Sequence, residues 1–424
     1  MTMRIWLLVL VSSIVAMAGV DTVYMEISAS GARLIPVGVI PFEKSEGNWS
    51  MLDEEPSQIL SRDFLLSGRL DAINQNSYSR LAFFKARAAY YLSGKLNRTS
   101  DGKVEVVCKL NATQSQEMVI GETYRIAPNQ VRQAIHDFAD KVIYQITGSV
   151  GVASTRIAYV AKIEGNKQIK VSDYDGYNPV QVTSHASINF MPAWGQDPDK
   201  LYFVSFRNGT SQIFERTMSN GDVRLLFPNL GQTFSPAGSP VSNEILFTVA
   251  SNGGSDLYRG IPATGKYERM TFQRAAETSP AFSPNGKEIL YSADRGGSPQ
   301  IYVMDRDGSD SRRITFMGRY NESPSWSPQG DRIAYASMDN GLFNIYTCDL
   351  DGSDVLQLTS NAGNNEHPSW SPDGTLIAFS STRSGSSQIY VMRKDGTGVT
   401  RITSGGENSW QTWAPKLNKE KPNE

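Results

Sequence analysis

Short apolar segments separated by polar turns return every 44 residues through the second half of the chain. Two series of isoleucine or leucine residues mark two strands of each unit, and a series of mainly threonine residues marks its end. A period of about 40 to 50 residues with several strands per unit is typical of a β-propeller. The three series are Ile157, Leu201, Ile245, Ile289, Ile333 and Ile377; Ile169, Ile213, Leu257, Ile301, Ile345 and Ile389; and Thr183, Phe227, Thr271, Thr315, Thr359 and Thr403.

One unit, residues 321–359, predicts four short strands divided by turn residues. Its second strand is apolar at consecutive positions, as is Ile289-Leu290-Tyr291 in the preceding unit. Such a run suits a strand that is covered on both faces, and sheets stacked around an axis provide that cover. The four strands are expected around Pro324–Ser327 and over Arg332–Ala336, Asn344–Cys348 and Val355–Thr359.

The repeats also predict how the ring closes. The first unit has its second strand, at Arg156–Val160, but no innermost strand before it. The segment Ser409–Pro415 resembles the innermost strand at Pro368–Pro372, with a slip of one residue. We therefore expect this C-terminal strand to complete the first blade and to seal a six-bladed propeller over residues 151–415, which leaves fewer free sheet edges.

Residues 20–150 show no repeat and predict an N-terminal α/β domain, with two helices on a small mixed sheet. Pro36, inside the first expected strand, favours either a sheet edge or the start of the strand. Helical spacing of apolar residues and a proline near the first turn predict the helices. The expected strands are Leu34–Phe42, Ala88–Leu96, Lys103–Leu110 and Met118–Ile126, and the expected helices are Ser57–Leu70 and Pro128–Gly148.

Residues 1–19 have the features of a secretory signal peptide: a basic start at Arg4, an apolar run, and Ala16-Met17-Ala18 before the cleavage point. An exported, soluble mature protein is expected, and the alternative is an uncleaved N-terminal anchor. Residues 416–424 predict a disordered charged tail.

Composition narrows the classes of function. With 41 basic and 43 acidic residues, the chain lacks the excess of positive charge that nucleic-acid binding requires. Cys108 and Cys348 fall in different predicted domains, which favours two free buried thiols over a disulfide or a metal site.

The residues also predict no catalysis, no cofactor and no metal. The three histidines, His136, His185 and His367, lack a metal-ligand spacing, and no nucleophile elbow is present. His136 is expected to be a surface or packing residue. The Asp-x-Asp-Gly sequences at 173–176, 305–308 and 349–352 resemble the start of a calcium loop, but those at 305 and 349 lack its final glutamate, so hairpin turns are expected.

The positions before each innermost strand predict a binding surface. Loops there should be exposed and should ring one mouth of the central channel, with acidic residues at the centre. The alternative is that the Glu side chains only bond nearby backbone amides. Trp326, Trp370 and Phe282 are expected in the blade core. The positions are Asn189-Phe190, Gln232-Thr233, Glu277-Thr278, Asn321-Glu322, Glu366-His367 and Glu407-Asn408.

The chain resembles the TolB family, the periplasmic component of Tol–Pal systems. The resemblance rests on Pro36–Phe42, Thr155–Val160 and Val171–Asn178, and more weakly on the Trp-Ser-Pro-x-Gly repeats. It implies a periplasmic protein without catalysis, whose propeller binds the lipoprotein Pal and whose N-terminal segment binds TolA, in support of outer-membrane integrity and constriction at cell division. A monomer is expected, with other outer-membrane or peptidoglycan-associated proteins as further possible partners.

The resemblance also implies site residues. It places Pal contacts on the propeller and TolA contacts in the N-terminal segment, near residues 20–34. The alternatives are a propeller that binds saccharide or peptidoglycan directly, and a propeller hydrolase or lyase that uses channel carboxylates. The implied Pal-binding residues are Glu277, Thr278, Asn321, Glu322, Glu366 and His367, and the implied TolA-binding residues are Val23, Tyr24, Met25, Glu26 and Ile27.

Overall fold

A computed structural model of the protein describes residues 34–251 and 253–416. The expected signal peptide, the expected TolA-binding residues 23–27 and residues 417–424 of the expected tail lie outside the described residues. Within the described part, no helix is both long enough and apolar enough to cross a lipid bilayer.

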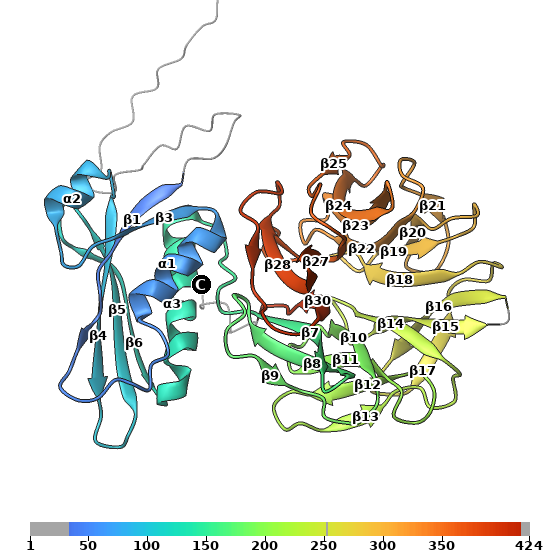
Figure 1. Cartoon of the computed structure of the whole chain (residues 1–424), viewed down its shortest axis with the longest axis horizontal. Helices are drawn as coiled ribbons and strands as arrows, with labels where there is room; N and C mark the ends of the chain where they lie inside the picture. Colours follow the sequence, from blue (N-terminus) through green and yellow to red (C-terminus); the bar gives the residue numbers. More distant parts are fainter. Residues whose placement is uncertain (1–33, 252, 417–424) are drawn as a thin grey trace, which may run out of the picture. The chain divides into compact units, whose positions relative to one another are not determined.

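Residues 34–148 form an α/β region with one sheet of order β3-β1-β4-β5-β6, in which β2 also pairs with β4 (Figure 1). β1 runs parallel to β3 and β4, while β4, β5 and β6 are antiparallel, so the sheet is mixed as expected. The elements are β1 (Ile35–Val39), β2 (Glu43–Lys44), α1 (Pro56–Ser67), β3 (Leu70–Asn74), α2 (Arg80–Lys85), β4 (Tyr90–Arg98), β5 (Val104–Ala112), β6 (Met118–Ile126), the 3₁₀ turn Pro128–Gln130 and α3 (Val131–Thr147).

The two long helices confirm the sequence prediction, and their ends follow local rules. Pro56 opens α1, and Gly68 and Gly148 end α1 and α3 in the left-handed conformation that glycine adopts readily. The structure adds α2, β2 and β3, which the apolar pattern did not predict. Pro36 lies at the second position of β1, which is an interior strand, so the start of a strand is the correct alternative and the edge is wrong.

The propeller consists of six four-stranded antiparallel sheets, which confirms the predicted fold class. Five sheets follow the chain order, and each begins with its innermost strand. Their strands are β10 (Asn189–Trp194), β11 (Lys200–Ser205), β12 (Gln212–Thr217) and β13 (Val223–Leu225); β14 (Thr233–Gly238), β15 (Ile245–Ser251), β16 (Gly254–Ile261) and β17 (Lys266–Arg269); β18 (Glu277–Phe282), β19 (Glu288–Ala293), β20 (Gln300–Asp305) and β21 (Arg312–Arg313); β22 (Asn321–Trp326), β23 (Arg332–Asp339), β24 (Leu342–Asp349) and β25 (Leu356–Gln357); and β26 (Asn365–Trp370), β27 (Leu376–Ser384), β28 (Ser386–Arg393) and β29 (Thr400–Arg401).

The sixth sheet closes the ring as predicted. Its order is β30-β7-β8-β9, formed by β30 (Asn408–Trp413), β7 (Arg156–Ile163), β8 (Asn166–Asp173) and β9 (Val180–Gln181). The C-terminal strand is antiparallel to β7, with Asn408 opposite Ala161 and Trp413 opposite Ile157.

The apolar series form the core between neighbouring sheets. Every residue of the two aliphatic series is fully buried. A typical cluster joins Leu290 and Ile301 of one blade to Trp326, Ile333 and Tyr335 of the next. Burial against both neighbours explains why the second strands are apolar at consecutive positions, since each fully buried aliphatic side chain contributes about 1.5 to 3 kcal/mol. Trp326, Trp370 and Phe282 are also buried, as expected.

The threonine series joins consecutive blades through hydrogen bonds. The Thr315 hydroxyl accepts from the Ile301 amide at 2.9 Å and donates to Gln300 Oε1 at 2.9 Å. The Asn321 amide, on the innermost strand of the next blade, also donates to Gln300 Oε1, at 2.8 Å. The amides of Ile169, Leu257, Ile345 and Ile389 bond to Thr183, Thr271, Thr359 and Thr403 in the same way.

Phe227 interrupts the threonine series, and a threonine on the next strand replaces the missing hydroxyl. The Ile213 amide has no threonine at position 227, and it donates instead to the hydroxyl of Thr233 at 3.0 Å. Thr233 opens β14 at the place where Asn321 opens β22. A hydroxyl therefore reaches the same amide from the neighbouring strand, which leaves room for Phe227 to stack on Phe247 at 4.8 Å between ring centroids.

We expect Thr315→Val and Thr233→Val to be destabilising to a similar degree, by about 1 to 3 kcal/mol each. Either change leaves a buried backbone amide without its acceptor while keeping the side-chain volume. Urea unfolding of each variant measures this difference. A Thr233→Val variant as stable as the wild type would contradict the assignment of Thr233 as the substitute for the missing threonine.

The Asp-x-Asp-Gly sequences are hairpin turns between the third and fourth strands, as expected. The Gly352 amide donates to the Asp349 carbonyl at 2.9 Å, and Gly352 has a positive φ of 83°. A Cβ at Gly352 would lie 2.2 Å from the carbonyl oxygen of Ile314 in the preceding blade, so the close approach of the blades also requires glycine. Cys108 and Cys348 are free and buried, as predicted.

Candidate functional site

The candidate Pal-binding residues lie inside the innermost strands rather than in the loops before them. Asn321 opens β22, Glu277 opens β18, and each strand contains a bulge that begins two residues after its first residue. The bulge residues Ser279, Ser323 and His367 have positive φ values near 50°. The sequence prediction placed the start of each innermost strand at the proline that follows the bulge residue. The strands begin earlier, so the prediction of pre-strand loops is wrong. We call Thr278, Glu322, Glu366 and His367 the rim residues.

Glu277 and Asn321 were expected to be exposed, and both are fully buried. Glu277 Oε1 accepts from Arg295 Nε at 3.0 Å. Asn321 donates to Gln300 Oε1 and to the Met317 carbonyl, both at 2.8 Å. Asn321 joins two adjacent blades through Gln300, whereas Glu277 pairs with Arg295 of its own blade. Both side chains are turned into the protein, which corrects the expectation of an exposed surface at these two positions.

Glu322 and Glu366 are the acidic centre of the rim, and both are half-buried. Burial raises the pKa of the Glu322 carboxyl, and the like charge of Glu366 on the neighbouring blade raises it further. The Tyr320 hydroxyl hydrogen-bonds to Glu322 and acts in the opposite direction. Burial also raises the pKa of Glu366. Two carboxylates in a partly desolvated channel favour a positively charged contact group.

His367 stacks on Trp410 of β30, with 3.9 Å between the ring centroids. Burial and the nearby positive charge of Lys167 lower the pKa of His367 to about 4, so the imidazole is neutral at neutral pH. Its Nδ1 lies 3.4 Å from the Ser380 hydroxyl. Thr278, the fourth rim residue, is half-buried at the equivalent position in β18. The structure therefore supplies the rim with one neutral aromatic face beside two acids.

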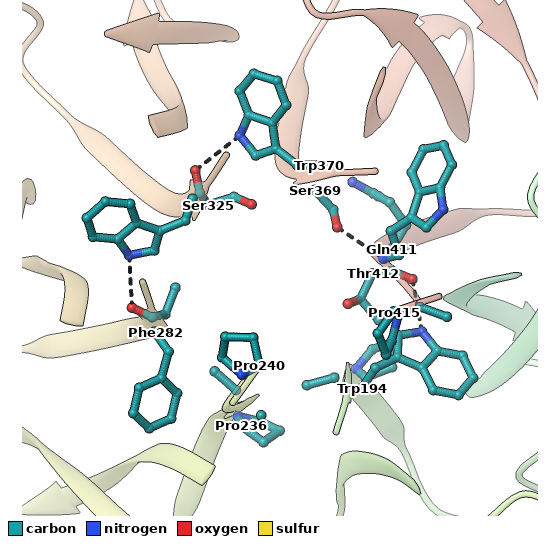
Figure 2. A pocket seen from close by; sticks show the side chains of 18 of the residues that line it. Trp194, Pro236, Pro240, Phe282, Ser325, Ser369, Trp370, Gln411, Thr412 and Pro415 are labelled. Atoms are coloured by element: carbon teal, nitrogen blue, oxygen red, sulfur yellow. Dashed lines mark hydrogen bonds between the residues drawn. The ribbon is translucent and has the colours of Figure 1, made fainter. Parts of the chain in front are cut away.

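The central channel contains a cavity of about 590 Å³ that His367 and the bulge residues line. Figure 2 shows Trp194, Phe282 and Trp370 around it, together with Pro236 and Pro240. The Trp370 indole donates to the Ser325 carbonyl of the preceding blade at 3.2 Å, and the Trp194 indole donates to Thr412 at 3.2 Å. These tryptophans connect the inner strands, which accounts for their burial.

Three arginines recur at a spacing of 88 residues, and two of them bind the first residue of an innermost strand. The sequence analysis missed them. They lie in alternate blades: Arg207 and Arg295 follow the second strands β11 and β19, and Arg383 lies near the end of the second strand β27. Arg295 binds Glu277, Arg383 donates to Asn365 Oδ1 at 3.0 Å, and Arg207 lies over the Phe214 ring at 4.5 Å. Their regular spacing was the signal that could have identified them.

A second cluster of ionisable residues lies where α1 and α3 meet the turn after β8. Asp63, His136 and Asp175 place ligand-type atoms within 4.8 Å of one another. However, Arg62 and Arg132 bind Asp175, and Asp63 accepts from the Tyr174 hydroxyl at 2.8 Å. Because these carboxylates already have cationic or hydrogen-bonding partners, the arrangement favours an ion-pair network over a metal site. His136 is fully buried, so the packing alternative is confirmed and the surface alternative is wrong.

The remaining histidine and the N-terminal prediction add no further site. His185 is exposed, and its ring lies 3.0 Å from the Ser187 hydroxyl. The expected TolA-binding residues, Val23 to Ile27, lie outside the described residues, so their placement stays a prediction.

Comparisons with known proteins agree with this architecture. A family model described as the TolB beta propeller domain matches residues 143–345 and 321–419. Two curated relatives carry the name Tol-Pal system protein TolB. The protein from Methylobacillus flagellatus is 31% identical over 48% of this chain and 49% of its own length, and that from Dechloromonas aromatica is 30% identical over 46% and 47%. The chain spans about half the length of the curated relatives it matches.

A solved structure extends the similarity to both regions. The crystal structure of TolB from Acinetobacter baumannii matches 91% of this chain and 97% of its own, with a TM-score of 0.78 and 27% sequence identity. Since the family model alone covers more than half of the sequence, the resemblance noted from the sequence is confirmed. The chain belongs to the TolB family of β-propeller proteins.

Proposed function

We propose that this protein is a non-catalytic periplasmic adaptor of a Tol–Pal system. Its propeller binds Pal through the rim residues, and its N-terminal segment, around Val23 to Ile27, binds TolA. Through these contacts it supports outer-membrane integrity and constriction of the envelope during cell division. The names of the curated relatives support the assignment to a Tol–Pal system, because both are called Tol-Pal system protein TolB.

The proposal rests on one observation: the rim combines half-buried carboxylates with exposed apolar side chains in the adjoining loops. Glu322 and Glu366 sit half-buried at its centre with raised pKa values. The loops that lead into β18 and β22 expose Phe272, Phe316 and Met317, each about 70% accessible. A charged centre beside exposed aromatic residues is typical of protein-binding hot spots. Glu277 and Asn321 would act by fixing the strands that present these groups.

We expect Glu322→Lys to weaken binding of the purified periplasmic domain of Pal by at least about tenfold, or about 1.4 kcal/mol. The change reverses a charge at the half-desolvated centre of the rim, where complementarity to the partner matters most. Titration calorimetry with the mature protein measures the affinity, and thermal unfolding establishes that the ring is intact.

Glu43→Lys is the matched control, because it makes the same change in charge at an exposed position of the α/β region. Its affinity for Pal should equal that of the wild type. Equal affinity of the Glu322→Lys variant would count against the rim as the binding site. Binding of the wild type to protein-free peptidoglycan, with none to Pal, would favour direct recognition of saccharide instead.

A further inference from the structure

A buried network of charged groups connects the α/β region to the propeller. Arg62 donates to Asp175 at 3.2 Å, and Arg132 lies 3.3 Å from Asp173. Asp63, His136 and Asp175 are buried, with at most 6% of their surface accessible. We call this network the boundary cluster, and its members are Glu54, Arg62, Asp63, Arg132 and His136 from the α/β region and Asp173, Tyr174, Asp175 and Tyr177 from the propeller.

Asp63 also joins the two regions directly. Its Oδ1 accepts from the Tyr174 hydroxyl of the propeller at 2.8 Å, and its Oδ2 lies 2.8 Å from His136 Nδ1 on α3. The imidazole also meets the edge of the Tyr174 ring, with 5.7 Å between centroids. His136 Nε2 is buried and has no hydrogen-bond partner. The charge of the imidazole is therefore set by the carboxylates around it rather than by solvent.

The balance of charge in the boundary cluster depends on one proton. The cluster holds four carboxylates, on Glu54, Asp63, Asp173 and Asp175, and two guanidinium groups, on Arg62 and Arg132. A proton on the His136–Asp63 pair reduces the excess negative charge from two to one. Because charges in a buried site are poorly screened, this proton should matter to the contact between the regions.

The groups that face His136 come from three elements. Asp63 and Arg62 lie on α1, Arg132 lies on α3, and Asp173, Tyr174 and Asp175 lie at the end of β8 and in the turn after it. Burial and Arg132 lower the pKa of His136, whereas Asp63 and Asp175 raise it, and the net shift is upward. Burial raises the pKa of Asp63 as well, so the pair holds its proton more tightly than the separate groups would.

We propose that His136 and Asp63 form a proton-dependent latch, which holds the α/β region on the propeller while the pair carries its proton. Loss of the proton leaves Asp63 and Asp175 close together in a buried site, and the contact between the regions weakens. The latch is a property of the fold and does not depend on the proposed function in a Tol–Pal system.

The sign of the pH dependence follows from linkage. A histidine exposed by separation of the regions has a pKa of about 6.5, whereas the docked pair has a higher one. The stabilisation of docking by this proton is therefore complete below about pH 6.5. It is lost as the pH rises through the pKa of the docked pair. Between these limits one proton links the two states, so the docking equilibrium constant should fall by up to about tenfold per pH unit.

Fluorescence energy transfer between the two regions tests the latch in the full mature chain. Dyes are placed on Lys85→Cys in α2 and Lys266→Cys in β17, both exposed, while Cys108 and Cys348 are buried and should not react. NMR follows the His136 ring proton in parallel, since the chain has only three histidines. We expect the transfer efficiency to change as the pH rises from 6 to 9, with a midpoint that matches the His136 titration.

His136→Gln should abolish this pH dependence, because glutamine can bond to Asp63 but cannot carry the proton. His185→Gln is the matched control at an exposed histidine and should behave as the wild type. If His136→Gln does not fold, Tyr174→Phe keeps the titrating pair but removes its bond to the propeller, and it should release the regions at lower pH. The latch is overturned if transfer stays constant while His136 titrates, if His136 titrates below pH 6.5, or if the His136→Gln or Tyr174→Phe variant follows the wild-type curve.

Discussion

A chain that ends at Gly406 is expected to lose the cooperative fold of the propeller. The truncation removes β30, which is the innermost strand of the sheet that begins with β7. It also removes Trp413, whose indole donates to the Thr155 hydroxyl at 2.7 Å in a fully buried contact. The edge of β7 would then be exposed, and an unpaired strand of mainly buried residues favours aggregation. Circular dichroism and thermal unfolding of the truncated protein measure the loss.

A chain that ends at Lys416 is the matched control. It keeps every contact described for β30, and also the ion pair between Lys416, which follows the strand, and Asp140 at 3.1 Å. Its unfolding transition should match that of the full chain. A Gly406 truncation that unfolds at the same temperature as this control would show that the ring does not need its last strand for stability.

The sequence was sufficient to predict the ring because the repeat is dictated by packing. Each blade must bury the same aliphatic positions against both neighbours, so Ile333 and its equivalents recur at a fixed spacing. The closing strand could be predicted for the same reason, since Trp413 and Trp370 occupy the same position of the repeat, opposite Ile157 and Ile377. Local rules for helix ends likewise predicted α1 and α3.

The details of the rim could not be predicted because they depend on a backbone bulge. Ser323 and its equivalents adopt positive φ, although none of them is a glycine, so the residue types at these positions do not predict the bulge. The bulge places Asn321 inside the strand and turns it inwards, where it bonds to Gln300 of the preceding blade. Glu277 is buried for a second reason, which is that its partner, Arg295, lies in the turn after β19 of the same blade. Such pairings join residues distant in sequence and leave no local pattern.

The boundary cluster could not be predicted from the sequence for a related reason. His136 occupies an ordinary position of an amphipathic helix, and Asp63 lies on another helix 73 residues earlier. Neither residue belongs to a repeat or a motif. They are brought together only by the packing of α1 and α3 against the turn that carries Tyr174. Their sequence environment could therefore predict that they are buried, but not that they contact each other.

Arg295→Met is expected to lower the free energy of unfolding by about 3 to 5 kcal/mol, which is the cost of leaving a buried charge without its partner. The side chain of Glu277 is fully buried, and that of Arg295 is 17% exposed. Glu277 Oε2 has no hydrogen-bond partner even in the intact protein, so Arg295 is the group that compensates the carboxylate. Urea unfolding at pH 7 measures the loss of stability.

The double variant Glu277→Met, Arg295→Met separates the cost of the unpaired charge from the loss of packing. It should be more stable than Arg295→Met alone, because two apolar side chains replace the pair and no buried charge remains. Arg259→Met is the control, since Arg259 pairs with Glu268, whose side chain is 56% exposed, and a surface pair contributes at most about 1 kcal/mol. If Arg295→Met is no more destabilising than Arg259→Met, the carboxylate of Glu277 must be solvated in solution. Glu277 would then be available at the rim, as the sequence alone had predicted.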